Sequence, residues 1–191
     1  ARTRAAILAA VHRLLAAGHE SVSVTDIVRE SGISRSSFYS HFASLTELAI
    51  SMLGEEYARI AELDRDLRLA NTVSDLDAMR LSQERLVDHY VANRALYAAA
   101  VALSAETDRR AASEMAAPIL ENLRVLADLP PQLRAEIASV YIANAAVGLL
   151  HAWLRGEVEA TRDQLVTHLV DLLPPWFSHP DHTALATDRS S

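Results

Sequence analysis

The sequence contains no cysteine and no lysine, and glycine, proline and aromatic residues are scarce. The lack of cysteine excludes disulfide frameworks, thiolate zinc sites and cysteine nucleophiles. With five Gly, six Pro, 50% apolar and 23% charged residues, the chain is not disordered, collagen-like or of low complexity. β-Branched residues do not gather into alternating runs, so no strand is predicted. Ala and Leu dominate what remains, which is a helical composition.

The charge balance at first argues against a nucleic-acid partner. All 18 basic residues are arginine, 25 residues are acidic, and the net charge is −7. The charge is uneven, because residues 1–50 carry five Arg and four acids whereas the remainder carries 13 and 21. A near-neutral N-terminal part on an acidic body leaves DNA binding open, since the local surface matters more than the total.

One uncharged stretch, residues 137–154, reaches the lower length limit for a membrane span. It contains Ser139, Asn144 and His151 and has no second span beside it, so we interpret it as a buried core helix. The N-terminus runs straight into an amphipathic segment without a signal-peptide pattern. We therefore expect a cytoplasmic protein.

Caps, glycines and prolines divide the chain into helices. S-x-x-D, S-x-x-E and T-x-x-Q signatures begin at Ser23, Ser44, Ser74 and Thr161. Pro118 is expected to kink its helix or restart it. The predicted helices are residues 3–17, 24–31, 35–42, 45–69, 75–91, 94–104, 108–126, 133–155 and 162–173. The fold class is all-α, with a domain boundary inside or just after the helix that starts at Leu45.

Residues 24–42 have the form of a helix-turn-helix: a short helix, a tight turn at Gly32, and a second short helix. Apolar side chains of this segment are expected to pack onto the first helix. Short hydroxyls, one Arg and one Tyr then face outward, as a recognition helix requires: Arg35, Ser36, Ser37, Tyr39 and Ser40. The alternative is an ordinary helical hairpin with a solvated serine face.

Residues 7–53 resemble the DNA-binding domain of the TetR/AcrR family of transcriptional regulators. The matching features fall in order without gaps: Ala10, Gly18, the Val24-Thr25 helix start, Ile27, "SGIS", "FYSHF", and S-x-x-E-L at Ser44 to Leu48. The resemblance implies an N-terminal helix-turn-helix three-helix domain, residues 1–46. It also implies a C-terminal helical ligand-binding and dimerisation bundle, residues 47–191.

The resemblance also implies roles for single residues. Thr25 would contact a DNA phosphate at a helix N-terminus. The major groove would be lined by Ser34, Arg35, Ser36 and Ser37, and backbone phosphates would be held by Tyr39 and His41. One position departs from the family pattern, because Leu45 stands where a Lys is usual. One phosphate contact is then missing unless Arg2 or Arg4 supplies it.

The last two long helices read as a dimer pair, since both carry broad apolar faces. The expected interface residues are Val147, Gly148, His151, Leu165, Leu169 and Leu172. Burial of these faces within one subunit is the alternative. A ligand pocket is predicted from polar or adaptable residues on inward stripes: Met79, Gln83, Leu86, Tyr90, Tyr97, Met115, Tyr141 and Asn144. For any one of them, ordinary core packing is the competing interpretation.

No arrangement typical of catalysis or metal binding occurs in the sequence, so we expect no enzyme, cofactor or metal. Glu-x-x-His is absent, and His179 and His182 in the tail are read as a solvated terminus. The function predicted is a ligand-responsive regulator, more a repressor than an activator. It would bind a palindromic operator as a homodimer and be released by a small hydrophobic or aromatic effector. The alternative is an all-α small-molecule-binding protein or enzyme without DNA function.

Overall fold

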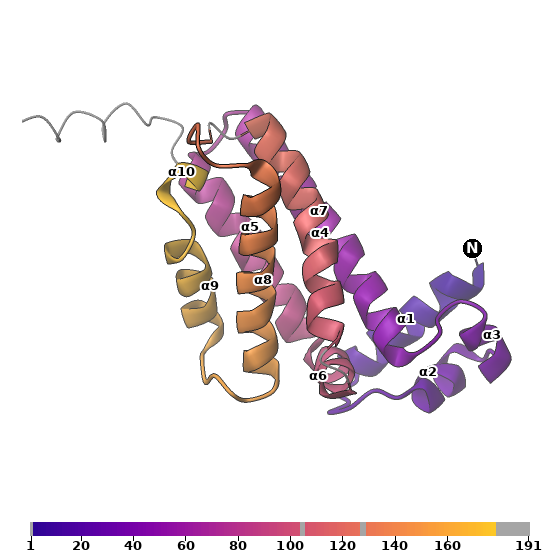
Figure 1. The fold of residues 1–191 in the computed structure, drawn as a ribbon. Helices are drawn as coiled ribbons and strands as arrows, with labels where there is room; N and C mark the ends of the chain where they lie inside the picture. The colour runs from indigo at the N-terminus through magenta and orange to yellow at the C-terminus, as the bar shows by residue number, and fades with distance from the viewer. Residues whose placement is uncertain (1, 104–105, 127–128, 179–191) are drawn as a thin grey trace, which may run out of the picture.

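The computed structural model describes residues 2–103, 106–126 and 129–178. Over these residues it contains ten helices and no strand, so the all-α prediction is confirmed. The helices form a small N-terminal head set against the foot of a taller bundle, the body (Figure 1). His179 and His182 lie outside the described residues.

The head consists of α1 (Arg2–Ala16), α2 (Val24–Ser31) and α3 (Arg35–Tyr39). The Ser23 hydroxyl accepts the Asp26 amide while the Asp26 carboxylate accepts the Ser23 amide, which is the predicted capping box. α1 packs on α2, and α2 packs on α3. The predicted pattern of three short helices is confirmed, although α3 ends at Tyr39.

The long helix α4 (Leu45–Leu69) belongs to both parts of the molecule. Its N-cap is Ser44, whose hydroxyl accepts the Glu47 amide. The first turns of α4 lie beside α1 and its later turns rise through the body (Figure 1). The same helix therefore contacts both the head and the body.

The body packs around α4 with α5 (Asp75–Ala92), α6 (Arg94–Leu103), α7 (Glu106–Leu126), α8 (Ala135–Leu154) and α9 (Arg162–Asp171). α7 packs on α8 and on α4, and α5 packs on α4 and α9. Pro118 lies inside α7 without ending it, so the expected restart does not occur. A further short helix, α10 (Pro175–Ser178), follows where Pro174 and Pro175 predicted only a stop.

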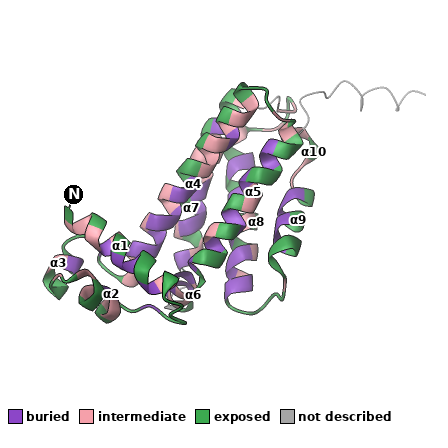
Figure 2. Ribbon diagram, turned by 180° about the vertical axis from the view of Figure 1, so that it is seen from behind, coloured by how far each residue is buried: buried purple, intermediate pink, exposed green. Residues whose placement is uncertain are grey.

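One cluster of buried apolar side chains runs through head and body. It extends from Ile7 and Phe38 in the head, through Leu48 and Leu53 of α4, to Leu150 of α8. The buried faces of the helices point toward one another across this core (Figure 2). Because the cluster is continuous, the head is packed onto the body rather than tethered to it.

α8 is long and apolar enough to cross a membrane by length and composition alone, but half of its apolar window is buried inside the protein. It packs against α7 and α6. This agrees with its interpretation as a core helix.

Candidate nucleic-acid interface and internal cavity

The turn between α2 and α3 has the geometry that the sequence predicts. Gly32 adopts φ +70°, a left-handed conformation suited to glycine, and its amide donates to the Val28 carbonyl. Two residues later Ser34 caps α3, with its hydroxyl accepting the Ser37 amide at 3.1 Å. The two short helices are thereby held at a fixed relative orientation.

α3 buries one side and exposes the other. Phe38 is fully buried and makes an edge-to-face contact with Tyr39 and a tilted contact with Phe42, with ring centroids 5.5 and 5.9 Å away. Tyr39 is 50% exposed although it is a large aromatic residue. The other expected groove residues are also at the surface, with Ser37 half-buried: Ser34, Arg35, Ser36 and Ser37. These side chains form what we call the α3 face.

Thr25 lies on the exposed first turn of α2 and joins the α3 face. Its Oγ1 accepts a hydrogen bond from Arg35 Nη2 at 3.0 Å, so residues from both helices meet there. His41 is exposed just after α3. The structure thus brings all seven predicted DNA-contact residues onto the α2–α3 side of the head.

The structure shows what occupies position 45, where the family pattern has a lysine and this sequence has Leu45. Leu45 is half-buried and packs against the apolar core, so it offers no charge to a phosphate. Arg4 is already held, because it donates to Ser51 at 2.9 Å and pairs with Glu55, while its guanidinium lies over the Phe42 ring. Arg2 is exposed at the start of α1 and is the freer of the two candidates for that contact.

A cavity of about 290 Å³ lies in the body between α4, α5, α7, α8 and α9, with α10 at one end, and opens to the surface beside the exposed Tyr141 and Leu172. Its walls include five of the predicted pocket residues: Met79, Gln83, Leu86, Met115 and Tyr141. Most of the remaining wall is aliphatic. This is the size and lining of a site for a small apolar molecule.

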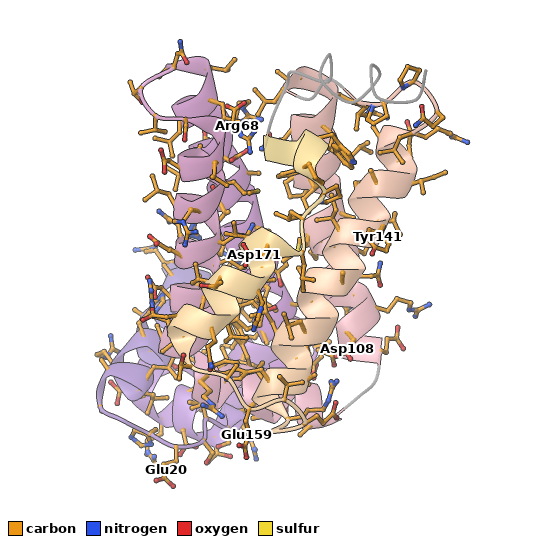
Figure 3. The ribbon with its side chains drawn as sticks, turned by 90° about the vertical axis from the view of Figure 1, so that its left-hand side faces the viewer. Glu20, Arg68, Asp108, Tyr141, Glu159 and Asp171 are labelled. Carbon is orange, nitrogen blue, oxygen red and sulfur yellow. The ribbon has the colours of Figure 1, made fainter. Side chains whose placement is uncertain are left out.

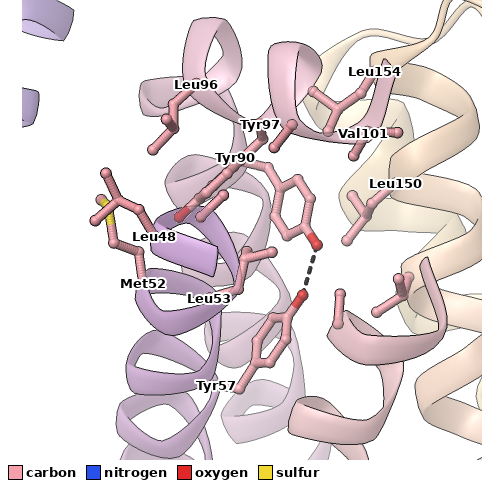
Figure 4. Packing of buried hydrophobic residues seen from close by; sticks show 14 of the residues in the cluster. Leu48, Met52, Leu53, Tyr57, Tyr90, Leu96, Tyr97, Val101, Leu150 and Leu154 are labelled. Atoms are coloured by element: carbon pink, nitrogen blue, oxygen red, sulfur yellow. Dashed lines mark hydrogen bonds between the residues drawn. The ribbon is translucent and has the colours of Figure 1, made fainter. Parts of the chain in front are cut away.

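Two predicted pocket residues lie elsewhere in the core. Tyr90 and Tyr97 are fully buried and do not border the cavity. The Tyr90 hydroxyl bonds to that of Tyr57 at 2.6 Å, as Figure 4 shows, and lies 3.3 Å from His151 Nε2. Tyr97 bonds to His89. Burial raises the pKa of the Tyr57 phenol well above its usual value, so it acts in this network as a neutral group.

Asn144 faces away from the cavity. It is exposed on α8, and its amide nitrogen donates to the Val140 carbonyl of its own helix at 2.8 Å. An amide that is satisfied by its own helix has less to offer a ligand.

The residues predicted for the dimer pair fall into two groups. Gly148 and Leu172 are exposed, and Leu172 is 75% exposed. The others are buried inside the single subunit: Val147, His151, Leu165 and Leu169. His151 donates from Nδ1 to the Asp108 carboxylate at 2.6 Å, and its Nε2 lies 3.3 Å from the Tyr90 hydroxyl, so its polar atoms are used internally. The apolar side chains that α8 exposes are instead Ile137, Val140 and Tyr141.

Several cavity residues could not be found from sequence patterns. Tyr57 and Asp64 border the cavity from α4, and Asn122 and Phe177 border it from α7 and α10. Asp64 is only 7% exposed but looks in the sequence like one of several solvated acids on α4. The one sequence signal for Asp64 was its spacing of seven residues from Tyr57, which puts both side chains on one side of α4.

Among the described residues, no group of three or more His, Asp or Glu side chains could hold a metal ion. A helix-turn-helix head with an exposed polar recognition face, packed on a helical body with an apolar cavity, defines a DNA-binding regulator with a ligand-sized chamber.

Comparison with known proteins finds a family match for the N-terminal domain and similar folds for most of the chain. Residues 7–52 match the sequence model of the bacterial regulatory proteins of the tetR family. The fold is similar to a TetR transcriptional regulator from Streptococcus agalactiae 2603V, with 19% identity, 89% of this chain and 92% of that chain covered, and a TM-score of 0.50. It is also similar to a TetR-family protein from Mesorhizobium loti MAFF303099, with 14% identity, the same coverages and a TM-score of 0.52. No curated protein sequence matches the chain.

The family model covers the N-terminal part of the chain, so residues 7–52 form a DNA-binding domain of the TetR type. The two solved structures extend the likeness in fold to the body.

Proposed function

We propose that this protein is a ligand-responsive transcriptional regulator, acting as a repressor, which binds a palindromic operator as a homodimer and is released by a small apolar effector. The observation that carries the proposal is the α3 face: a short helix in a helix-turn-helix that exposes Arg35, two serines and Tyr39 while burying Phe38. The half-exposed Tyr39 keeps its hydroxyl available to a DNA phosphate.

The roles on DNA follow from chemistry and position. Arg35 would make two hydrogen bonds to a guanine edge in the major groove, with Ser34, Ser36 and Ser37 beside it. Thr25, Tyr39 and His41 would hold phosphates, Thr25 with the free amides of the α2 N-terminus. In the free protein Arg35 is held at Thr25, and it would exchange that bond for a base on binding.

We divide the chain into a DNA-binding domain, residues 1–46, and a ligand-binding and dimerisation domain, residues 47–191. The boundary falls in the first turn of α4, which is packed against the head while the rest of the helix borders the cavity. Tyr57, Ile60 and Asp64 all line the cavity from α4. An effector that displaces these side chains would shift α4 and so change the separation of two heads in a dimer.

For the dimer we propose the outward face of α8 with the end of α9. The exposed apolar residues Ile137, Val140, Tyr141 and Leu172 support it, together with Gly148 for close backbone approach. The four buried residues of the predicted interface would pack beneath this surface, inside each subunit. We expect the protein to work in the cytoplasm without a cofactor and without catalytic activity.

Operator selection followed by substitution tests the proposal. Sequences retained by the protein from a random DNA pool are first enriched and titrated in gel shifts. Arg35→Ala should then weaken binding by about 1–3 kcal/mol and relax base preference at one position of each half-site. Arg109→Ala is the matched control, because Arg109 is a 77% exposed arginine of α7 that pairs within its own helix.

Failure to enrich any sequence would favour the alternative, an all-α small-molecule-binding protein or enzyme without DNA function. Enrichment with equal binding by Arg35→Ala and wild type would instead move the base contacts off α3.

A further inference from the structure

The cavity has one charged residue in its wall. Among the described residues that line it, Asp64 carries a negative charge and no Arg, Lys or His is present. The side chain of Asp64 is only 10% exposed. An apolar chamber with one buried carboxylate is electrostatically asymmetric, because it offers a counter-charge to a cation and none to an anion.

The partners of Asp64 do not neutralise its surroundings. Arg68 donates from Nε to Asp64 Oδ1 at 3.0 Å, but it also lies 3.9 Å from Asp75 at the N-terminus of α5. One positive charge thus serves two carboxylates, and the group of three has a net charge of −1. Arg68 is further anchored by the Phe177 carbonyl at 3.0 Å and by that residue's ring.

Arg68 itself is not placed to receive an anion. It lies beside α10 (Figure 3) and does not border the cavity. Its Nη2 atom is buried and has no hydrogen-bond partner within the described parts of the chain. The space next to it is about 10 Å³, enough for one water molecule but too small for a carboxylate group.

The energetics of Asp64 favour a cationic neighbour. Burial raises the pKa of the Asp64 carboxyl, and Arg68 offsets this only in part. Burial disfavours the charged form of a carboxyl group. A positive charge brought within a few ångströms in the same low-dielectric space would therefore stabilise the carboxylate. The rest of the wall suits such a guest, since π-faces and thioethers attract cations: Tyr57, Met79, Met115, Tyr141 and Phe177.

We propose that the effector is an amphiphilic monocation: an apolar, preferably aromatic body carrying one ammonium or amidinium group that pairs with Asp64. Its body lies among the aliphatic and aromatic side chains and its charge points toward the α10 end. The unpaired amide of Gln83 and hydroxyl of Tyr141 would orient its remaining polar atoms. This inference rests on the proposed function for the word effector, while the preference for a cation concerns the cavity alone.

Three naphthalenes of one shape test the preference on the wild-type protein: 2-(aminomethyl)naphthalene, 2-(hydroxymethyl)naphthalene and 2-naphthoate. Each is titrated calorimetrically at neutral pH, where they are a cation, a neutral molecule and an anion. The cation should bind about tenfold more tightly than the alcohol, with the carboxylate weakest. Equal affinities, no binding of the cation, or tighter binding of 2-naphthoate would overturn the proposal.

Asp64→Asn then assigns the preference to one residue. It preserves the shape and an oxygen for Arg68, and should bring the affinities for the cation and the alcohol within about twofold of one another. Asp66→Asn is the matched control, because Asp66 is an exposed aspartate of the same helix, and it should keep the tenfold ratio. If Asp64→Asn does not fold, the wild-type ranking still decides the proposal.

Operator binding separates this inference from the proposed function. A protein that prefers the cation but enriches no DNA would refute the regulator and leave the cavity assignment standing. A protein that binds its operator but prefers 2-naphthoate would refute the cation preference and leave the regulator standing.

Discussion

His89 is a histidine whose ionisation is strongly altered by the fold. It lies on α5 with Nε2 2.5 Å from the Tyr97 hydroxyl and Nδ1 3.9 Å from Glu56, and its side chain is 16% exposed. Burial lowers the pKa of the His89 imidazole to about 4; the attraction of Glu56 opposes this and the nearby charges of Arg59, His12 and Arg85 assist it. His151 is shifted in the same direction, also by burial.

These shifts predict a loss of stability in weak acid. The unfolded chain binds the His89 proton near pH 6.5, whereas the folded chain resists it until about pH 4, so the free energy of unfolding falls as the pH drops through this window. For His89 the loss between pH 7 and pH 5 is about 2 kcal/mol. In guanidinium titrations at the two pH values, His89→Gln should show a loss smaller by that amount.

The exposed histidine of α9 provides the control for this experiment. His168→Gln removes an exposed imidazole from α9 and controls for the loss of a histidine as such. Equal pH dependence in His89→Gln and wild type would mean that His89 is protonated in the native state without cost.

At the residue scale, the sequence predicts which face of a helix a side chain occupies, but not what surrounds that side chain in the folded protein. Gln83 and Tyr90 share one stripe of α5, as predicted, yet Gln83 borders the cavity and Tyr90 lies in the hydrogen-bonded core. The difference comes from which helix stands opposite each turn of α5, a long-range property that periodicity does not contain.

Local sequence information succeeds at the scale of the element, because helix ends are decided by nearby atoms. The caps at Ser23, Ser44 and Thr161 were predicted from neighbouring residues and form hydrogen bonds within three residues of each. Pro118 shows the limit of such rules, since α7 continues through it while packed on α4 and α8. Tertiary packing offsets the lost backbone hydrogen bond.

One face of α8 is apolar yet exposed, and this face leads to a prediction at the scale of the element. A Cβ built at Gly148 meets no atom within 4 Å, so Gly148→Glu fits the single subunit. Across the proposed helix pair the same side chain would put two carboxylates together in a desolvated contact. We expect a folded monomer by sedimentation, with operator affinity lost because two linked heads are needed for avidity.

A control variant tests whether an added carboxylate disrupts the dimer wherever it is placed on the surface. Ala58→Glu adds a carboxylate to the exposed side of α4 and should sediment as wild type. A stable dimer in Gly148→Glu would place the interface away from this face of α8.

At the scale of the whole molecule, α4 is connected by packing and by ion pairs to α1 of the head and to α7 of the body. Arg4 of α1 pairs with Glu55 of α4, within the region where α4 leaves the head. Arg110 of α7 donates to Glu47 in the first turn of α4 at 2.7 Å, with both side chains about two-fifths exposed. α7 also borders the cavity through Met115 and Ile119. One helix therefore touches both the cavity and the base of the head.

The pair between Arg110 and Glu47 is expected to steady the head more than it stabilises the fold. A half-exposed ion pair contributes about 0.2–1 kcal/mol, so Arg110→Met should change global stability little. Local opening of the first turns of α4 should become easier, with hydrogen exchange of amides 46–53 accelerated up to about fivefold at low salt and less at high salt. Arg109→Met is the adjacent control, because Arg109 pairs with Glu106 inside α7 and does not reach α4. If both variants exchange like wild type, the Arg110–Glu47 pair does not help to hold the head in place, and a ligand signal would have to pass through α4 rather than through α7.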